Sequence, residues 1–196
     1  MKLLLSTHNE HKRREFARLL PGHEVIALPD DFELPPEDGQ TFAENALGKA
    51  RAAAGLAGEL DALAFADDSG IEAKALGGAP GVRSARYAGE QASDLENLAK
   101  LLREAPEGSG LRYVCALALV DPGTGEEQVF IGDCVGTLTR QTRGERGFGY
   151  DPAFVPDEQP SGAMESRSTM AQLSDEQKDA ISHRGRALRK LLAYLS

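Results

Sequence analysis

Short apolar runs alternate along this chain with segments of helical periodicity, and this alternation limits the possible fold more than any other feature. Residues 2–6 form a short, largely apolar run that stops at Thr7, and Phe16, Leu19 and Leu20 then follow with the i, i+3, i+4 spacing of a helix face. Residues 24–28 and 63–66 predict two further short strands. The alternation predicts an α/β protein.

Two longer apolar segments indicate the type of sheet. Residues 111–121 and 126–140 flank a Gly/Pro-containing turn at 122–125, which predicts a hairpin. Thr41 and Glu44 have the spacing of a capping box and open an Ala-rich helix that we expect to reach about Ala57. Two more helices are predicted by Leu95, Leu98, Leu101 and Leu102 and by Leu188, Leu191, Leu192 and Leu195. We expect a mixed, long-stranded, twisted sheet with flanking helices.

Composition limits the domain count and the partners. The 196 residues are enough to bury a core without disulfides, and we find no linker, so we expect a single domain over residues 1–196. The net charge of -9 argues against general affinity for nucleic acid or anionic membrane, because both reward positive charge. Cys115 and Cys134 lie in strand-like stretches without metal-ligand spacing. We expect reduced thiols in a cytoplasmic protein.

Polar residues follow the first predicted strand. In open α/β folds, ligands bind beyond the carboxyl ends of strands. The segment of residues 7–12 places hydroxyl, amide and backbone N–H groups at a helix start, which is a natural anion site, and it ends in a lysine. Its members are Thr7, His8, Asn9, Glu10, His11 and Lys12. The alternative is that Thr7 or Asn9 simply caps the helix.

A second polar segment, Asp67-Asp68-Ser69-Gly70, follows the apolar run 63–66, and we expect it at the end of that strand. Two adjacent carboxylates before a glycine suit a hard cation with oxygen ligands, and Mg²⁺ would supply positive charge that the chain lacks. The alternative is a solvated acidic turn. Glu44 is a cap residue or a cleft residue, and Glu37 lies in an acidic loop.

Two later segments contain aromatic and basic residues. Phe148 and Tyr150 lie in a Gly-rich loop beside Asp151, where an aromatic ring could stack on a planar base or could instead anchor the loop as a hydrophobic plug. Lys178 precedes the compact segment Ser182-His183-Arg184-Gly185. A solvated basic helix face would explain Lys178 but explains the compact segment much less well.

Taken together, these segments resemble the inosine/xanthosine triphosphate pyrophosphatase family over essentially the whole chain. Seven segments appear in the family's order and spacing, which is far more specific than any one motif. They read STHNEHK (6–12), TFAENA (41–46), DDSG (67–70), LGGAPG (76–81), SARY (84–87), GFGYDP (147–152) and ISHRG (181–185).

The resemblance implies a fold, a reaction and an assembly. The fold would be a mixed α/β fold with two lobes around a central substrate cleft, and the protein would be a homodimer. The reaction would be Mg²⁺-dependent hydrolysis of non-canonical purine nucleoside triphosphates (ITP, dITP, XTP) to the monophosphate and pyrophosphate, which would cleanse the nucleotide pool.

The resemblance also implies residue roles. Asp68 would be the general base and a metal ligand, with Glu37 and Glu44 as further candidate ligands. Thr7, Asn9 and Lys12 would surround the phosphates, and Ser69 would contact substrate. The residues at the nucleotide would be Phe148, Gly149, Tyr150, Asp151 and Lys178, with His183 and Arg184 as the pair that reads the base. The alternatives are a Maf-like pyrophosphatase acting on modified or pyrimidine triphosphates and a non-catalytic nucleotide sensor.

Overall fold

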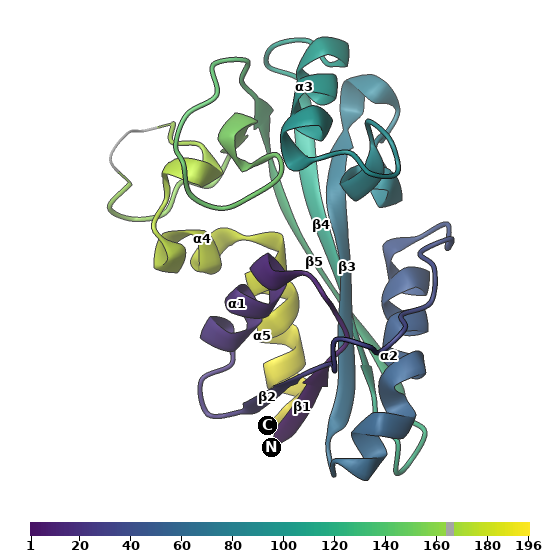
Figure 1. Cartoon of the computed structure of the whole chain (residues 1–196). Helices are drawn as coiled ribbons and strands as arrows, with labels where there is room; N and C mark the ends of the chain where they lie inside the picture. Colours follow the sequence, from purple (N-terminus) through teal and green to yellow (C-terminus); the bar gives the residue numbers. More distant parts are fainter. Residues whose placement is uncertain (164–166) are drawn as a thin grey trace. The chain divides into compact units, whose positions relative to one another are not determined.

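The computed structural model describes residues 1–163 and 167–196 and contains a six-stranded sheet in the order β2-β1-β3-β4-β5-β6 (Figure 1). The strands are β1 (Lys2–Leu5), β2 (Glu24–Ala27), β3 (Leu63–Ala73), β4 (Gly110–Val120), β5 (Glu127–Leu138) and β6 (Phe154–Pro156). Strand β1 is parallel to β2 and to β3, whereas β5 and β6 are antiparallel. The predicted mixed sheet is therefore confirmed.

Among the described residues, four helices match the periodicity predicted from the sequence, and one short helix, Asp175–Ile181, was not predicted. The helices are α1 (Glu10–Leu19), α2 (Phe42–Glu59), α3 (Asp94–Glu104), α4 (Asp175–Ile181) and α5 (His183–Leu195), with 3-10 turns η1 (Lys74–Leu76), η2 (Gly81–Arg86), η3 (Asp151–Ala153) and η4 (Met170–Gln172). Thr41 and Glu44 form the predicted capping box, and α2 extends two residues beyond the expected Ala57. Among the residues that the structure describes, no helix is long and apolar enough to cross a membrane.

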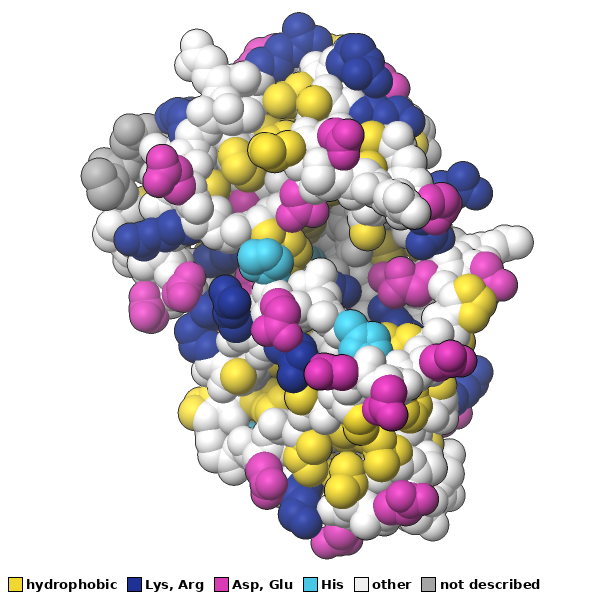
Figure 2. Space-filling model, in the orientation of Figure 1, with side chains coloured by type: hydrophobic (Ala, Val, Ile, Leu, Met, Phe, Trp, Pro, Cys, Tyr) yellow, Lys and Arg dark blue, Asp and Glu magenta, His cyan; other side chains and the backbone are white. Residues whose placement is uncertain are grey.

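The chain divides into two compact units, each built from separate segments. The first unit comprises Met1–Asp68, Cys115–Ile131 and Ala187–Ser196, and the second comprises Ser69–Val114 and Gly132–Arg186. The expectation of a single domain stays a prediction. On the face drawn in Figure 2, acidic and basic side chains are interspersed rather than gathered by sign.

The first unit packs helices on both faces of its strands. Helix α2 covers one face, and α1 and α5 cover the other (Figure 1). The alanines of α2 allow close approach because they have almost no side chain, and Ala46, Ala50, Ala53 and Ala57 are fully buried. On the other face, Phe16 of α1 meets Phe65 of β3 edge to face, with ring centroids 5.3 Å apart.

The second unit has its own core. Leu98 and Leu101 of α3 pack with Ile71 of β3, Phe154 of β6 and Ile181 of α4. The same core contains Tyr150, so burial holds the loop between β5 and β6, which carries Phe148, against α4 within this unit.

The end of β3 corrects the sequence prediction. We expected a strand over 63–66 that ends at Asp67, but β3 continues through Asp67 and Asp68 to Ala73. The strand can continue because both carboxylates are paired with lysines of the helices, Asp67 with Lys12 and Asp68 with Lys49. The acidic pair therefore lies within a strand rather than in a turn, which excludes the alternative of a solvated acidic turn.

Candidate active site

The segment after β1 builds the start of α1. Asn9 is the N-cap, and its Oδ1 accepts the Lys12 backbone N–H at 3.1 Å. The Asn9 N–H donates to Thr7 Oγ1 at 3.2 Å. The capping alternative is confirmed for Asn9. The cap also directs the Lys12 side chain, whose Nζ lies 3.1 Å from Oδ2 of the fully buried Asp67.

The other members of this segment make different contacts. A ring nitrogen of His8, Nε2, donates to the Phe32 carbonyl at 2.8 Å, which connects His8 to the loop that leads to Glu37. Glu10 pairs with Arg13 at 2.8 Å on the surface, and His11 is exposed. Substrate contacts by His8, Glu10 and His11 stay predictions.

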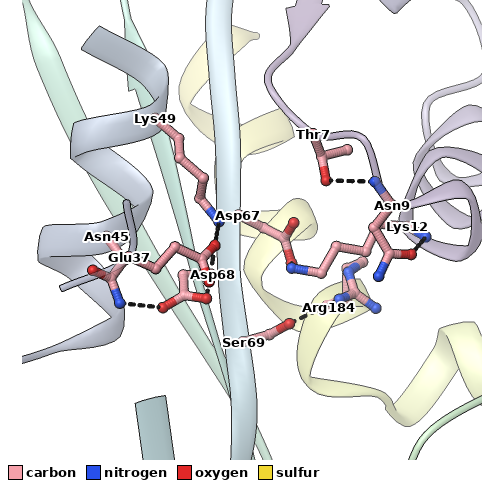
Figure 3. A network of polar contacts seen from close by, with 10 residues as sticks. All are labelled: Thr7, Asn9, Lys12, Glu37, Asn45, Lys49, Asp67, Asp68, Ser69 and Arg184. Carbon is pink, nitrogen blue, oxygen red and sulfur yellow. Dashed lines mark hydrogen bonds and ion pairs between the residues drawn. The ribbon is translucent and has the colours of Figure 1, made fainter. Parts of the chain in front are cut away.

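Three carboxylates and two lysines come together in the first unit, and we call this set, with Asn45, the carboxylate–lysine group (Figure 3). Its members are Lys12, Glu37, Asn45, Lys49, Asp67 and Asp68. Asn45 Nδ2 donates to Asp68 Oδ2 at 2.9 Å. Lys49 Nζ donates to Glu37 and lies 3.9 Å from Asp68 Oδ1. One lysine thus bridges two carboxylates.

Burial and neighbouring charges shift the pKa values of two of these carboxylates, Asp68 and Glu37, in opposite directions. Burial raises the pKa of Asp68, and the nearby Lys49 only partly opposes this effect. Burial alone would also raise the pKa of Glu37, but the Lys49 ammonium outweighs it and holds that pKa below its usual value. Burial would lower the pKa of Lys49, yet Glu37 and the two aspartates raise it, so Lys49 stays charged. Asp68 is consequently a stronger base than a surface aspartate.

A second set of polar and aromatic side chains lies in the second unit, and we call it the aromatic–cation group. Its members are Ser69, Tyr113, Phe148, Asp151, Lys178, His183 and Arg184. The buried Asp151 lies at its centre. Its Oδ2 accepts from Lys178 Nζ at 2.8 Å and from the Phe148 N–H at 3.0 Å, and its Oδ1 accepts from the Tyr113 hydroxyl at 3.0 Å.

Two cations approach the Phe148 ring. Lys178 Nζ lies 5.0 Å and Arg184 Cζ 5.9 Å from the ring centroid. Arg184 is 1% exposed and donates to Ser69 Oγ at 3.0 Å. These contacts order an aromatic ring beside groups that only donate hydrogen bonds. The compact segment at the start of α5 is therefore buried, unlike a solvated helix face.

Comparison with known proteins identifies the family. The family model described as the Ham1 family matches residues 3–194. This chain belongs to the Ham1 family.

Similar proteins match this Ham1 chain over its full length. The protein of Desulforamulus reducens named dITP/XTP pyrophosphatase is 45% identical over 205 residues, which cover 100% of this chain and 96% of that protein. The Geobacter sulfurreducens protein of the same name is 46% identical over 202 residues, covering 99% and 96%. The solved Ham1 protein of Staphylococcus aureus matches with a TM-score of 0.81 at 39% identity, covering 100% of this chain and 98% of that one.

Two residues of the carboxylate–lysine group had no role in the sequence prediction. Asn45 and Lys49 are both buried on α2. Their spacing of i, i+4 puts them on one side of the helix, next to the buried alanines Ala46 and Ala50. A polar pair that follows the alanine stripe of an amphipathic helix is a signal that could have identified them.

The carboxylates of this Ham1 chain fit a metal that is shared with a ligand. Mg²⁺ typically takes one or two protein carboxylates together with phosphate oxygens and water. Glu37 and Asp68 both contact Lys49 Nζ, so their oxygens surround one cationic position. Within residues 1–163 and 167–196, no three or more His, Cys, Asp and Glu side chains form a cluster that would hold a metal alone. The donor set suits a metal that arrives with phosphates.

Glu44 has a structural function in the Ham1 chain. Its Oε2 accepts the backbone N–H groups of Gln40 at 2.7 Å and of Thr41 at 3.1 Å, and its own N–H donates to Thr41 Oγ1 at 3.1 Å. These bonds hold its carboxylate at the helix start. Of its two sequence interpretations, the cap is confirmed, and metal binding by Glu44 stays a prediction.

The loop of Phe148 is anchored at two further points. The Gly149 N–H donates to Asp94 Oδ2 at 2.9 Å, and the Tyr150 hydroxyl donates to the Ser84 carbonyl at 2.7 Å. Tyr150 is buried in the core, which matches the alternative of a hydrophobic plug. Nucleotide contacts by Gly149 and Tyr150 stay predictions.

Proposed function

We propose that this protein hydrolyses non-canonical purine nucleoside triphosphates, namely ITP, dITP and XTP, to the nucleoside monophosphate and pyrophosphate. The observation that carries the proposal is the buried Asp68, a carboxylate of raised pKa held by Asn45 and Lys49, in a chain that matches named dITP/XTP pyrophosphatases over its full length. Such a base can activate the water that attacks phosphorus.

The carboxylate–lysine group would act on the triphosphate. Asp68 would take the proton of the attacking water, and the ammonium groups of Lys12 and Lys49 would donate to phosphate oxygens as charge grows on the leaving pyrophosphate. Glu37 and Asp68 would hold Mg²⁺, which would supply positive charge to those oxygens. Thr7 and Asn9 would add hydroxyl and amide donors beside the helix start.

The aromatic–cation group would select the purine base of the substrate. Phe148 offers an aromatic face on which a planar purine can stack. Arg184 only donates hydrogen bonds, and His183 and Arg184 would together read the base: their donors would favour a keto oxygen at C6 and leave the amino group of adenine without an acceptor. A buried mismatch of this kind rejects an analogue more strongly than a lost apolar contact does. ATP would therefore be a poor substrate.

The assembly and location are further parts of the proposal. We propose a homodimer in the cytoplasm, and we expect neither nucleic acid nor membrane as a partner. The dimer follows from the family resemblance. Cys115 and Cys134 are both buried and neither forms a disulfide, which is usual for proteins of the cytoplasm and supports this location.

Product analysis tests the reaction. The protein would be incubated with ITP, dITP, XTP, ATP and a modified pyrimidine triphosphate in Mg²⁺, and pyrophosphate and orthophosphate would be measured separately. We expect pyrophosphate from the first three nucleotides and at least about 100-fold slower turnover of ATP. A preference for the modified pyrimidine would instead indicate the Maf-like activity, and tight binding without turnover would indicate a sensor. Release of orthophosphate would contradict all of these alternatives.

A further inference from the structure

Tyr113 on β4 contacts two members of the aromatic–cation group through different parts of its side chain. Its hydroxyl donates to Asp151 Oδ1 at 3.0 Å. Its ring stacks on the His183 imidazole with centroids 4.7 Å apart and planes 7° apart. It also packs on Phe154, with centroids 4.7 Å apart. Tyr113 thus links the central carboxylate to the His183 imidazole.

The hydroxyl fixes the carboxylate of Asp151. Lys178 and the Phe148 N–H both bind Oδ2, and Tyr113 binds the other oxygen, so the three donors set the rotation of the carboxylate about its bond. Burial raises the pKa of Tyr113 well above its usual value, and the hydroxyl therefore keeps its proton and remains a donor. The position of Asp151 in turn determines the positions of the Phe148 backbone and the Lys178 ammonium, because both donate to it.

The ring fixes the plane of His183. An imidazole at a helix start can rotate about χ2, because that torsion has a broad minimum. A nearly parallel ring at stacking distance restricts this rotation, and the plane of the imidazole decides the direction in which its nitrogens can donate or accept. Tyr113, a residue of strand β4, thus contacts both Asp151, which orders the Phe148 loop, and His183 at the start of α5.

We propose that Tyr113 is a positioning residue for base selection, which acts through Asp151 and His183 without contacting the reacting atoms. The proposal rests on the proposed function, because that function assigns the aromatic–cation group to the base. Tyr113 lies in the protein interior, so it sets the geometry of the groups that contact the nucleotide. Its loss would loosen the selection of the base and leave the chemistry at phosphorus intact.

Two variants separate the hydroxyl from the ring. Tyr113→Phe removes the donor to Asp151 and keeps the stack, whereas Tyr113→Leu removes both. The control is Tyr87→Phe, which deletes a tyrosine hydroxyl that donates to Glu104 in the same unit. We expect Tyr113→Phe to lower the ITP-to-ATP ratio of kcat/KM by about tenfold, mainly through KM for ITP, with kcat nearly unchanged. Tyr113→Leu should lower the ratio by about tenfold more, and Tyr87→Phe should leave it unchanged.

A spectroscopic measurement checks the geometry independently of turnover. The chain has 4 histidines, and the ring current of Tyr113 acts on His183, so the His183 imidazole signal alone should shift strongly in NMR spectra of Tyr113→Leu. Tyr113→Phe should keep most of that shift. If Tyr113→Leu does not fold, Tyr113→Phe still tests the hydroxyl through the substrate ratio.

The outcomes distinguish this proposal from the proposed function. If the unmodified protein turns over ITP but the folded Tyr113 variants keep the ITP-to-ATP ratio, or lose both substrates equally, Tyr113 has only a structural function. An unmoved His183 signal in Tyr113→Leu would also overturn the proposal. If the unmodified protein does not turn over ITP, both the proposed function and the Tyr113 proposal fail.

Discussion

Gly147 is a residue at which a single methyl group should disturb the site. Its φ is +73°, and a Cβ at this position would lie 2.0 Å from Asp151 Oδ2. Gly147→Ala therefore forces either the loop or Asp151 to move. We expect kcat/KM for ITP to fall by about 100-fold, because Phe148 and Lys178 both depend on Asp151.

Gly108→Ala is the matched control for this change. Its φ of +74° gives a similar backbone strain in the same unit, but a Cβ there would meet nothing within 4 Å. Thermal unfolding should show a similar loss of stability in both variants, about 1–2 kcal/mol each. Equal losses of kcat/KM in the two would mean that strain, and not the contact with Asp151, disturbs the site.

Asp68 is the residue on which the chemical step depends. Asp68→Asn keeps the size of the side chain but removes the base, so kcat for ITP should fall by at least about 100-fold while nucleotide binding persists. Asp121→Asn makes the same chemical change at an exposed turn of the same unit and should leave kcat unchanged. Steady-state kinetics together with calorimetric binding of ITP would measure both. Near-normal kcat in Asp68→Asn would show that another group is the base.

At the scale of elements, a substitution at the start of α2 can distinguish two possible functions of Glu44, namely a helix cap and a metal ligand. Glutamine also completes a capping box, so Glu44→Gln should keep the cap and remove only the charge. If Glu44 caps the helix and binds no metal, this variant should need the same Mg²⁺ concentration for half-maximal turnover as the unmodified protein. Glu44→Ala should lower the free energy of unfolding by about 1 kcal/mol. A several-fold higher Mg²⁺ requirement in Glu44→Gln would instead make Glu44 a metal ligand.

The elements themselves were largely predictable from the sequence because their signals are local. The capping box at Thr41 and the leucine spacing of α5 depend on residues a few positions apart. The full length of β3 was not predictable in this way. Its continuation through Asp67 and Asp68 depends on Lys12 and Lys49, which lie on helices far away in the sequence.

The candidate site was predictable only in part for the same reason. Asp68 and Arg184 lie in compact motifs, which the sequence shows directly. The function proposed for Tyr113 could not be predicted from the apolar strand in which it lies, because it depends on a stack with His183, which is 70 positions away in the chain. A side chain whose function depends on one distant partner leaves no periodic or spacing signal.

At the scale of the whole molecule, charge balance connects the fold to its ligand. The chain has a net charge of -9, and the carboxylate–lysine group itself holds three carboxylates against two lysines. A nucleoside triphosphate adds further negative charge, so its binding needs positive charge beyond that of these two lysines. The same two lysines already neutralise much of the group in the protein alone. Metal should therefore be required for turnover but not for folding.

Chelation tests this separation. Excess EDTA should abolish ITP turnover, and added Mg²⁺ should restore it, because the metal would offset the charge of the phosphates. The melting temperature of the nucleotide-free protein should not change in EDTA, since Lys12 and Lys49 pair with the buried aspartates without a metal. EDTA saturated with Mg²⁺ is the control for effects of the chelator itself. A lower melting temperature in EDTA would indicate a structural metal, whereas full turnover in EDTA would contradict the proposed function of Mg²⁺ at Glu37 and Asp68.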